Sequence, residues 1–373
     1  MPGKRILLLY ISEVSGHHNA TLAIEKALKQ LDHQVSVLNI NSFNYTNPIL
    51  EKIINRAYLG VIKRTPRVWE YLYDNPKFIK KTQRIKDAVH KSNFKKFDVL
   101  FEKFKPTAVV CAQAFPCGLI ADYKRVFNLN VPLFGVLTDY FPHAYWVYDQ
   151  VNYYIVPSED AQKRLIKDGI LPERIKMFGI PIDPEFAKPH NRLEIAKRMH
   201  LDLSVPTILI MGGGQGIGPI KHIARGLNKS RFNLQIVVVC GTNKKLLKWL
   251  AKERPRNTQK VLALQYVSNI EELMEVSDFI ISKPGGLTTA EALAKGLPMI
   301  IIKPIPGQEE NNTEFLLRHG VAIKIDRLEN IHLEIERLIN DRNRVQRMRE
   351  NAKQLGKPNS AMDTARLILK SHV

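Results

Sequence analysis

Short hydrophobic runs recur along the chain, each followed by turn residues and then by apolar positions at helical spacing. In the N-terminal half, the run Ile6–Tyr10 is typical of a buried strand. The next segment repeats its apolar residues every three or four positions, and Gln34–Ile40 then alternates as a second strand. The predicted helix between them has one apolar face, made of Ala20, Ile24, Ala27, Leu28 and Leu31. This order predicts a strand–helix–strand unit.

The C-terminal half opens in the same way. Thr207–Met211 reads as a strand, Gly212–Gly216 as a glycine-rich turn that opens a helix, and Ile236–Cys240 as the following strand. Further strands are predicted at Ala108–Cys111, Leu133–Leu137, Tyr153–Val156, Phe279–Ser282 and Met299–Ile302. Repeated strand–turn–helix–strand units specify parallel sheets, so we predict an α/β protein with two Rossmann-like, doubly wound domains.

The domain boundary is predicted near residue 185, because Gly179–Pro184 is rich in residues that break regular structure. The N-terminal domain would span 1–185 and the C-terminal domain 186–373, with a last helix that can pack back on the N-terminal domain. In doubly wound domains, ligands bind at the carboxyl ends of the strands, so we expect both sites to face one cleft.

Composition places the chain among folded proteins of a reducing compartment. It has 373 residues, no apolar run long enough to span a membrane, and three cysteines without metal-ligand spacing. The segment Met1–Ile11 has the basic and apolar parts of a signal peptide, but it lacks a small-residue cleavage site and is better interpreted as the first strand.

The unusual property is charge: 56 Lys and Arg against 36 Asp and Glu give a net charge of +20. Such an excess predicts an anionic partner. Bases and aromatic residues are interleaved along Lys52–Lys96, which suits contact with a membrane surface as well as amphipathic helices with a solvated basic face. The predicted membrane or acceptor contacts are Lys63, Arg64, Arg67, Trp69, Lys80, Lys81 and Trp146. No recognised motif supports nucleic-acid binding.

Two familiar nucleotide sites are disfavoured. A dinucleotide site needs an acidic residue at the end of the second strand, but these strands end near Asn41 and at Cys240–Asn243. The chain also lacks the lysine-containing phosphate loop of P-loop proteins.

The most informative segments are Ser282–Gly296 and Pro304–Asn312. In the first, Gly285, Gly286 and Thr288 precede or open a helix whose N-terminal amides can receive a diphosphate, and Glu291 can accept hydrogen bonds from ribose hydroxyls. The second offers polar side chains suited to sugar hydroxyls. Alternatively, Glu291 only complements the helix dipole and Pro306–Gly307 is an ordinary turn. Because the two motifs follow consecutive predicted strands, they together favour a binding site over these two separate local explanations.

With these motifs, the chain resembles the processive diacylglycerol glycosyltransferases and monogalactosyldiacylglycerol synthases, a group related to the lipid-II N-acetylglucosaminyltransferase. The likeness covers nearly the whole chain and is carried by Ser15–His17, Leu137–Tyr140 with His143 and Trp146, Lys283–Ala292, and Lys303–Asn312. The N-terminal loop departs from the family pattern, because Val14 and Ser15 stand where relatives have glycine and a second histidine, His18, follows His17.

The resemblance implies a GT-B fold, a UDP-sugar donor, inversion at the anomeric carbon and monotopic attachment to the membrane. It implies that Glu291 binds the ribose, that Gln308 and Glu309 meet the sugar, and that backbone near Val267 meets uracil. The complete set of expected substrate-binding residues is Gly16, Gly213, Gly214, Gln215, Gly216, Val267, Lys283, Gly285, Gly286, Thr288, Glu291, Gln308, Glu309 and Asn312.

The expected reaction needs a general base, because an acceptor hydroxyl is a poor nucleophile. His17 matches the family's catalytic histidine, with Asp139 or His143 as partner or substitute. No two aspartates have the Asp-x-Asp spacing of metal-dependent transferases, so we expect neither a metal nor another cofactor. Helix N-termini would then stabilise the departing UDP.

We therefore expect an enzyme of the cytoplasmic face of the membrane that transfers a hexose from UDP-glucose or UDP-galactose to diacylglycerol. Three alternatives remain: N-acetylglucosamine transfer to a polyprenyl-linked acceptor, a UDP-sugar epimerase, and a non-catalytic UDP-sugar sensor.

Overall fold

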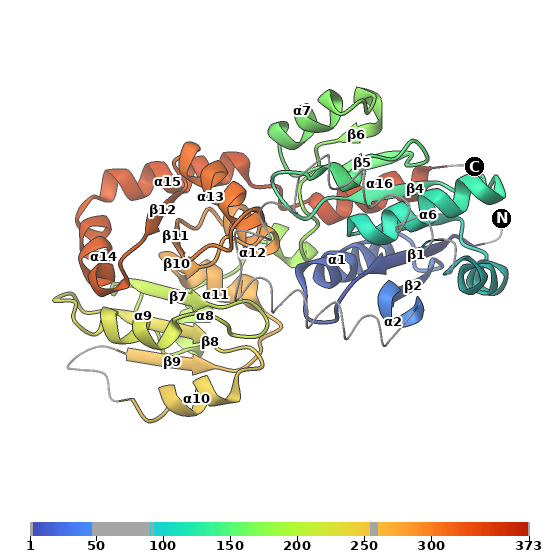
Figure 1. Cartoon of the computed structure of the whole chain (residues 1–373). Helices are drawn as coiled ribbons and strands as arrows, with labels where there is room; N and C mark the ends of the chain where they lie inside the picture. Colours follow the sequence, from blue (N-terminus) through green and yellow to red (C-terminus); the bar gives the residue numbers. More distant parts are fainter. Residues whose placement is uncertain (1–2, 47–89, 91–92, 254–259, 372–373) are drawn as a thin grey trace. The chain divides into compact units, whose positions relative to one another are not determined.

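The computed structural model describes residues 3–46, 90, 93–253 and 260–371 (Figure 1). Its contacts divide the chain into two compact units. The first comprises Met1–Pro184, Ile305–Asn311 and Asn359–Val373, and the second comprises Glu185–Pro304 and Asn312–Pro358. The segment Ile305–Asn311 therefore packs with the first unit although it lies between two stretches of the second.

The first unit is built on a parallel sheet with strand order β2-β1-β3-β4-β5-β6. Its strands are β1 Arg5–Tyr10, β2 Ser36–Asn41, β3 Ala108–Cys111, β4 Leu133–Val136, β5 Tyr153–Ile155 and β6 Ile175–Lys176. Among the described residues, its helices with defined bounds are α1 Gly16–Leu31, α2 Ser42–Thr46, α6 Ala114–Phe127, α7 Glu159–Lys167 and α16 Ser360–Lys370, and residues 93–104 are also helical. Short 3-10 helices lie at Ala144–Trp146 and Pro172–Arg174, and a third, Pro184–Ala187, spans the boundary to the second unit.

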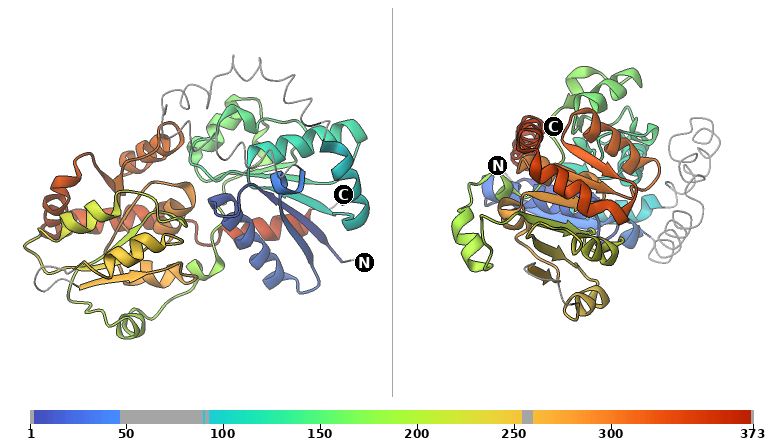
Figure 2. Two further views of the ribbon diagram at one scale, coloured as in Figure 1. Left: turned by 60° about the horizontal axis from the view of Figure 1, so that its bottom comes forward. Right: turned by 90° about the vertical axis from the view of Figure 1, so that its left-hand side faces the viewer.

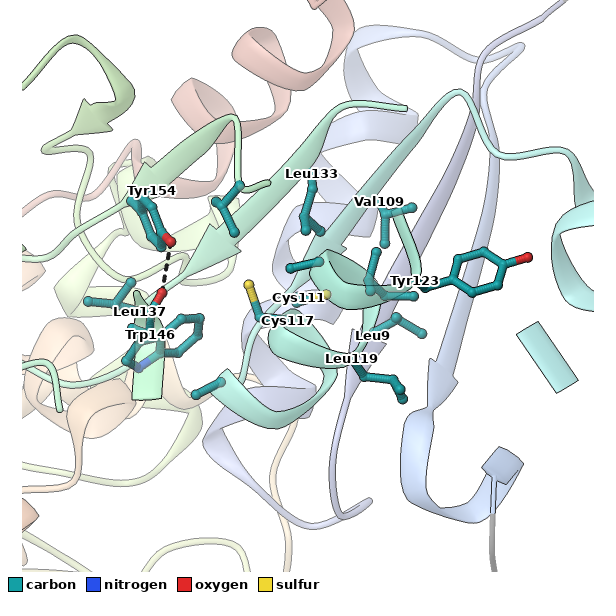
Figure 3. Close-up of a cluster of buried hydrophobic side chains, with 14 of the residues drawn as sticks. Leu9, Val109, Cys111, Cys117, Leu119, Tyr123, Leu133, Leu137, Trp146 and Tyr154 are labelled. Atoms are coloured by element: carbon teal, nitrogen blue, oxygen red, sulfur yellow. Dashed lines mark hydrogen bonds between the residues drawn. The ribbon is translucent and has the colours of Figure 1, made fainter. Parts of the chain in front are cut away.

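Alternation along β1 distributes its side chains to two cores. Ile6 and Leu8 pack in a cluster with residues of α1 and α16, whereas Leu7 and Leu9 pack in a cluster with residues of α6. Figure 3 shows part of the second cluster, in which the Tyr154 hydroxyl donates to the Trp146 carbonyl over 2.8 Å. The sheet is thus covered on both faces, and α16, red in Figures 1 and 2, lies beside α1.

The second unit has the strand order β12-β11-β10-β7-β8-β9, again all parallel. Its strands are β7 Thr207–Met211, β8 Gln235–Val239, β9 Lys260–Leu264, β10 Phe279–Ser282, β11 Met299–Ile302 and β12 Ala322–Ile325. Its helices are α8 Arg192–Arg198, α9 Ile220–Leu227, α10 Lys244–Leu250, α11 Ile270–Val276, α12 Gly286–Ala294, α14 Ile331–Asn340 and α15 Arg342–Leu355. Helix α13, Gln308–Arg318, is divided, because its residues up to Asn311 belong to the first unit. A 3-10 helix lies at Leu328–Asn330.

In each sheet the order reverses at one point. Strands β1 and β3 are neighbours in the first unit, and β7 and β10 are neighbours in the second. In both units the connections that leave these two strands go to opposite sides, which opens a crevice for ligands at the carboxyl ends. The two Rossmann-like sheets expected from the strand–helix order are confirmed.

Differences from the predicted elements are small and have local causes. The strands β6, β9 and β12 were not predicted, because β6 has only Ile175–Lys176 and both β9 and β12 contain lysine. Leu31, predicted on the buried face of the first helix, is 37% exposed at the last residue of α1.

Candidate active site

In the first unit, the loops after β1, β3 and β4 converge on the first turn of α1. Ser15 is the N-cap of this helix, and its hydroxyl accepts from the backbone N–H of His18 over 3.2 Å. The same hydroxyl donates to the carbonyls of Ile11 and Ser12. Ser12 has a φ of +64°, so the loop is tightly bent. Ser15 thus fixes the loop and caps α1, which begins at Gly16 directly before His17.

The ring of His17 contacts two groups that follow other strands, an arrangement that we call the clamp on His17. Its Nδ1 lies 2.9 Å from the carbonyl oxygen of Ala112, which follows β3, and 2.9 Å from Oγ1 of Thr138, which follows β4. Because a carbonyl only accepts, we infer that the proton of the neutral ring is on Nδ1. Nε2 then carries the lone pair. This is the tautomer that a general base requires.

The electrostatics of His17 favour the neutral ring. Burial lowers the pKa of His17 below its ordinary value, while the Asp139 carboxylate and the hydrogen bond to Ala112 offset part of this effect. A histidine with a lowered pKa is neutral at physiological pH. The side chain is therefore ready to accept a proton without first losing one.

His18, the other histidine of the loop, has a different environment. Its ring stacks on Tyr10 with a centroid distance of 4.1 Å, and its Nδ1 lies 2.8 Å from the Glu13 carbonyl. No contact joins it to the loops after β3 and β4 in the described residues. The clamp is thus specific to His17.

Asp139 and Gln308 are brought together. The Gln308 side-chain amide donates to the Asp139 carboxylate, and both residues belong to the first unit. Glu309 accepts from the backbone N–H of Ile305 over 2.6 Å, a contact within its own loop. The structure therefore joins one residue expected to bind sugar to a residue expected to support the base.

Trp146 is buried and His143 is partly buried. Burial, together with the charges of His17 and Arg164, lowers the pKa of His143 to about 4. At neutral pH this ring is therefore uncharged. Trp146 is 5% exposed within the core of Figure 3, so its indole is not available to a membrane surface, unlike our expectation.

In the second unit, the loop Gly212–Pro219 joins β7 to α9 and is shaped by glycine. Gly216 has a φ of +57°, and a Cβ there would lie 2.0 Å from the Cys240 carbonyl oxygen. Gly213 has a φ of +66°, but the space beside it is open. The helix begins at Ile220, later than the sequence suggested, so Gly213, Gly214 and Gln215 lie exposed in a loop.

The loop after β10 leads into α12 through Lys283 and Gly285. Gly285 is the N-cap, with no side chain to occupy the first amides of the helix, and no atom lies within 4 Å of where its Cβ would be. Gly286 and Thr288 lie in the first turn, and Glu291 is buried in the second. Open amides at the N-terminus of this helix suit an anionic group.

Asn312 is fully buried, and its side-chain amide donates to the Pro284 carbonyl over 2.9 Å. It thus holds the loop before α12 rather than presenting its amide to solvent. Val267 is partly buried in the loop between β9 and α11, next to Tyr266, which is 62% exposed. These residues follow the carboxyl ends of their strands, as expected for a nucleotide site of this fold.

Sequence reasoning missed two parts of the first unit's site. Ala112 contributes a backbone carbonyl, which no side-chain pattern reveals. Thr138 lies within the Leu137–Tyr140 segment that carries the family resemblance, but only the folded structure joins its hydroxyl to His17. The sequence thus pointed to the segment that contains Thr138, but it did not show that the Thr138 hydroxyl contacts His17.

Six of the predicted membrane or acceptor contacts are not among the residues that the structure describes. Lys63, Arg64, Arg67, Trp69, Lys80 and Lys81 lie outside the described residues. Within the described part, no helix is long and apolar enough to cross a membrane. In the same part, no three His, Cys, Asp or Glu side chains gather in a way that could hold a metal ion.

Comparison with solved structures gives the fold. MurG of Acinetobacter baumannii aligns with a TM-score of 0.65 at 16% identity, over 99% of this chain and all (100%) of that one. Anabaena HepE in complex with UDP-glucose aligns with a TM-score of 0.55 at 14% identity, over 98% of this chain and 99% of that one. These similarities, with the two parallel sheets, establish the GT-B fold.

Comparison of sequences gives the family. The family model described as monogalactosyldiacylglycerol (MGDG) synthase matches residues 17–182, and that of the glycosyltransferase family 28 C-terminal domain matches residues 207–367. The processive diacylglycerol β-glucosyltransferase of Bacillus subtilis (strain 168) is 31% identical over 98% of this chain and 95% of its own length. The chain is a glycosyltransferase, and it belongs to the family of diacylglycerol glycosyltransferases and monogalactosyldiacylglycerol synthases.

Proposed function

We propose that this enzyme transfers a hexose from a UDP-sugar to the free hydroxyl of diacylglycerol, with inversion at the anomeric carbon and without a metal ion. The reaction would take place at the cytoplasmic face of the membrane, with the enzyme attached as a peripheral protein. The observation that carries the proposal is the clamp on His17, which leaves Nε2 unprotonated at a strand switch point.

In this mechanism Nε2 of His17 takes the proton of the acceptor hydroxyl. The hydroxyl oxygen then forms a bond to the anomeric carbon as the bond from that carbon to UDP breaks. Asp139 stabilises the imidazolium that results, because its carboxylate favours the charged ring. The acceptor proton thus ends on His17, and the bonding electrons leave with UDP.

The second unit would hold the donor. The loops Gly212–Pro219 and Lys283–Gly286 flank the β7/β10 switch point, where a diphosphate can meet backbone amides. Glu291 would bind the ribose and backbone near Val267 the uracil. Positive charge from the N-terminus of α12 would stabilise the leaving UDP, which is the task of a metal in other transferases.

Glucose is the favoured sugar. The relatives are named β-glucosyltransferases, and HepE, of the same fold, has been solved in complex with UDP-glucose. UDP-glucose carries glucose in the α configuration, so a β product requires inversion and therefore one displacement assisted by a base.

The test is a donor screen. Purified enzyme is incubated with diacylglycerol liposomes and each UDP-sugar in EDTA, and lipids are analysed by mass spectrometry and by NMR of the anomeric proton. We expect a β-glucosyl-diacylglycerol. An α-linked product would refute inversion, strict dependence on added Mg²⁺ or Mn²⁺ would refute metal independence, and absence of any glycolipid would refute the acceptor.

A further inference from the structure

The stretch of the second unit that contains α9 and α10 is rich in positive charge and poor in acidic residues. Between Ile220 and Glu253, Lys and Arg occur eight times and Glu253 is the only acidic residue. The bases are Lys221, Arg225, Lys229, Arg231, Lys244, Lys245, Lys248 and Lys252, and all are exposed. We call this set the α9–α10 surface.

These bases share one side of the sheet. Strands β7, β8 and β9 are consecutive neighbours, and right-handed connections place α9 and α10 on the same face. The packing agrees, because both helices contribute to one hydrophobic cluster. Trp249 of α10 joins them: the Lys221 ammonium lies 5.2 Å and the Arg225 guanidinium 5.0 Å from its ring centroid. The charge is therefore continuous across the two helices.

Little within the fold neutralises this charge. Arg225 pairs with Glu253 over 3.0 Å and Arg231 with Glu336 over 3.1 Å. None of the six lysines pairs with a carboxylate in the described part of the chain. Like charges at this density repel one another and gain most from a partner that brings many negative charges at once.

We propose that the α9–α10 surface docks the second unit on the anionic surface of a lipid bilayer. This rests on the proposed function, because an enzyme that glycosylates diacylglycerol must work at a bilayer. It is distinct from the predicted contact at Lys52–Lys96, which belongs to the first half of the chain. Trp249 is partly buried against the core of the second unit and holds Lys221 and Arg225 over its ring, and the lipid partner follows from the diacylglycerol acceptor and from the complementary charge of an anionic bilayer.

The test uses the full-length enzyme and a matched pair of triple variants. K229Q/K248Q/K252Q removes three charges from the α9–α10 surface, while R342Q/R344Q/R347Q removes three exposed charges from α15 of the same unit. None of these residues belongs to the candidate active site. Binding is measured by sedimentation with vesicles of phosphatidylcholine, alone or mixed with phosphatidylglycerol.

Each base near an anionic leaflet changes affinity by roughly fivefold, so the α9–α10 variant should bind phosphatidylglycerol vesicles at least about tenfold more weakly. The α15 variant should bind nearly as the wild type does. Equal losses in both variants, or no loss in either, would overturn the proposal. Loss of binding to duplex DNA with unchanged vesicle binding would overturn it in favour of a nucleic acid.

A second measurement separates this proposal from the proposed function. Transfer to diacylglycerol in neutral detergent micelles should be similar in the wild type and both variants, because micelles need no anionic docking. Absence of transfer in the wild type would refute the proposed function while the vesicle result still tests the surface. A loss confined to the α9–α10 variant in micelles would refute a docking role and indicate damage to the second unit.

Discussion

The candidate sites of the two units lie at equivalent switch points of their sheets but use different chemical groups. At the β1/β3 switch point, an imidazole is partly buried and held by a carbonyl and a hydroxyl. At the β7/β10 switch point, glycine loops and an uncapped helix N-terminus leave backbone amides open. The first arrangement suits proton transfer by one side chain, and the second suits recognition of an anion by backbone. Substitutions in the two regions should therefore affect different kinetic quantities.

The largest effect is expected from His17→Ala, because it removes the group proposed to accept the proton. We expect kcat to fall roughly a hundredfold to ten-thousandfold, with little change in UDP affinity. Steady-state kinetics with diacylglycerol and calorimetric titration with UDP measure the two quantities. His18→Ala is the matched control and should keep most of the activity, since its ring packs on Tyr10. Turnover of the His17 variant near the wild-type rate would remove His17 from the mechanism.

A smaller effect, on donor binding, is expected from Gly216→Ala. The new Cβ would lie 2.0 Å from the Cys240 carbonyl oxygen, so the loop must move. We expect UDP affinity to fall about tenfold, which corresponds to about 1.4 kcal/mol of binding free energy, because the displaced loop would no longer present its amides to the diphosphate.

The control for this substitution is Gly213→Ala, which shares a positive φ but has open space around its Cβ. It should reduce UDP affinity less. If both glycine variants bind UDP equally well, the tight approach at Gly216 does not shape the donor site.

The smallest effect is a change in pH dependence. The proposed base works when neutral, so activity should be lost as the pH falls through the pKa of His17. The Asp139 carboxylate raises that pKa, and Asp139→Asn should therefore move the acidic limb of the kcat profile to lower pH. Asp149→Asn, an exposed position at the opposite end of the strands, should leave the limb unchanged. A shift to higher pH in the Asp139 variant would contradict the proposed electrostatics.

The fold could be predicted because its signal is local. Runs such as Ile6–Tyr10 and Phe279–Ile281 lie on parallel strands whose sheet is covered on both faces, and they are hydrophobic at every position. The strand Lys260–Leu264 is only partly buried along its length, so its pattern is weak and it was missed.

The residue types of the site were also readable from the chain, but their surroundings were not. His17 stood out beside Gly16, and Lys283–Glu291 stood out as a glycine turn before a helix. We expected Trp146 to be exposed, but it is a core residue that packs in the hydrophobic cluster of Figure 3.

The sequence by itself determined the two doubly wound sheets, the family, and the residues that can carry the chemistry. These depend on neighbouring residues and on short motifs. Only the tertiary structure decided the tautomer of His17, because Ala112 and Thr138 reach it from strands far along the chain. It also decided that Asn312 supports a loop and that the bases of α9 and α10 form one surface. Such contacts depend on which strands become neighbours, and that is fixed only when the whole sheet has formed.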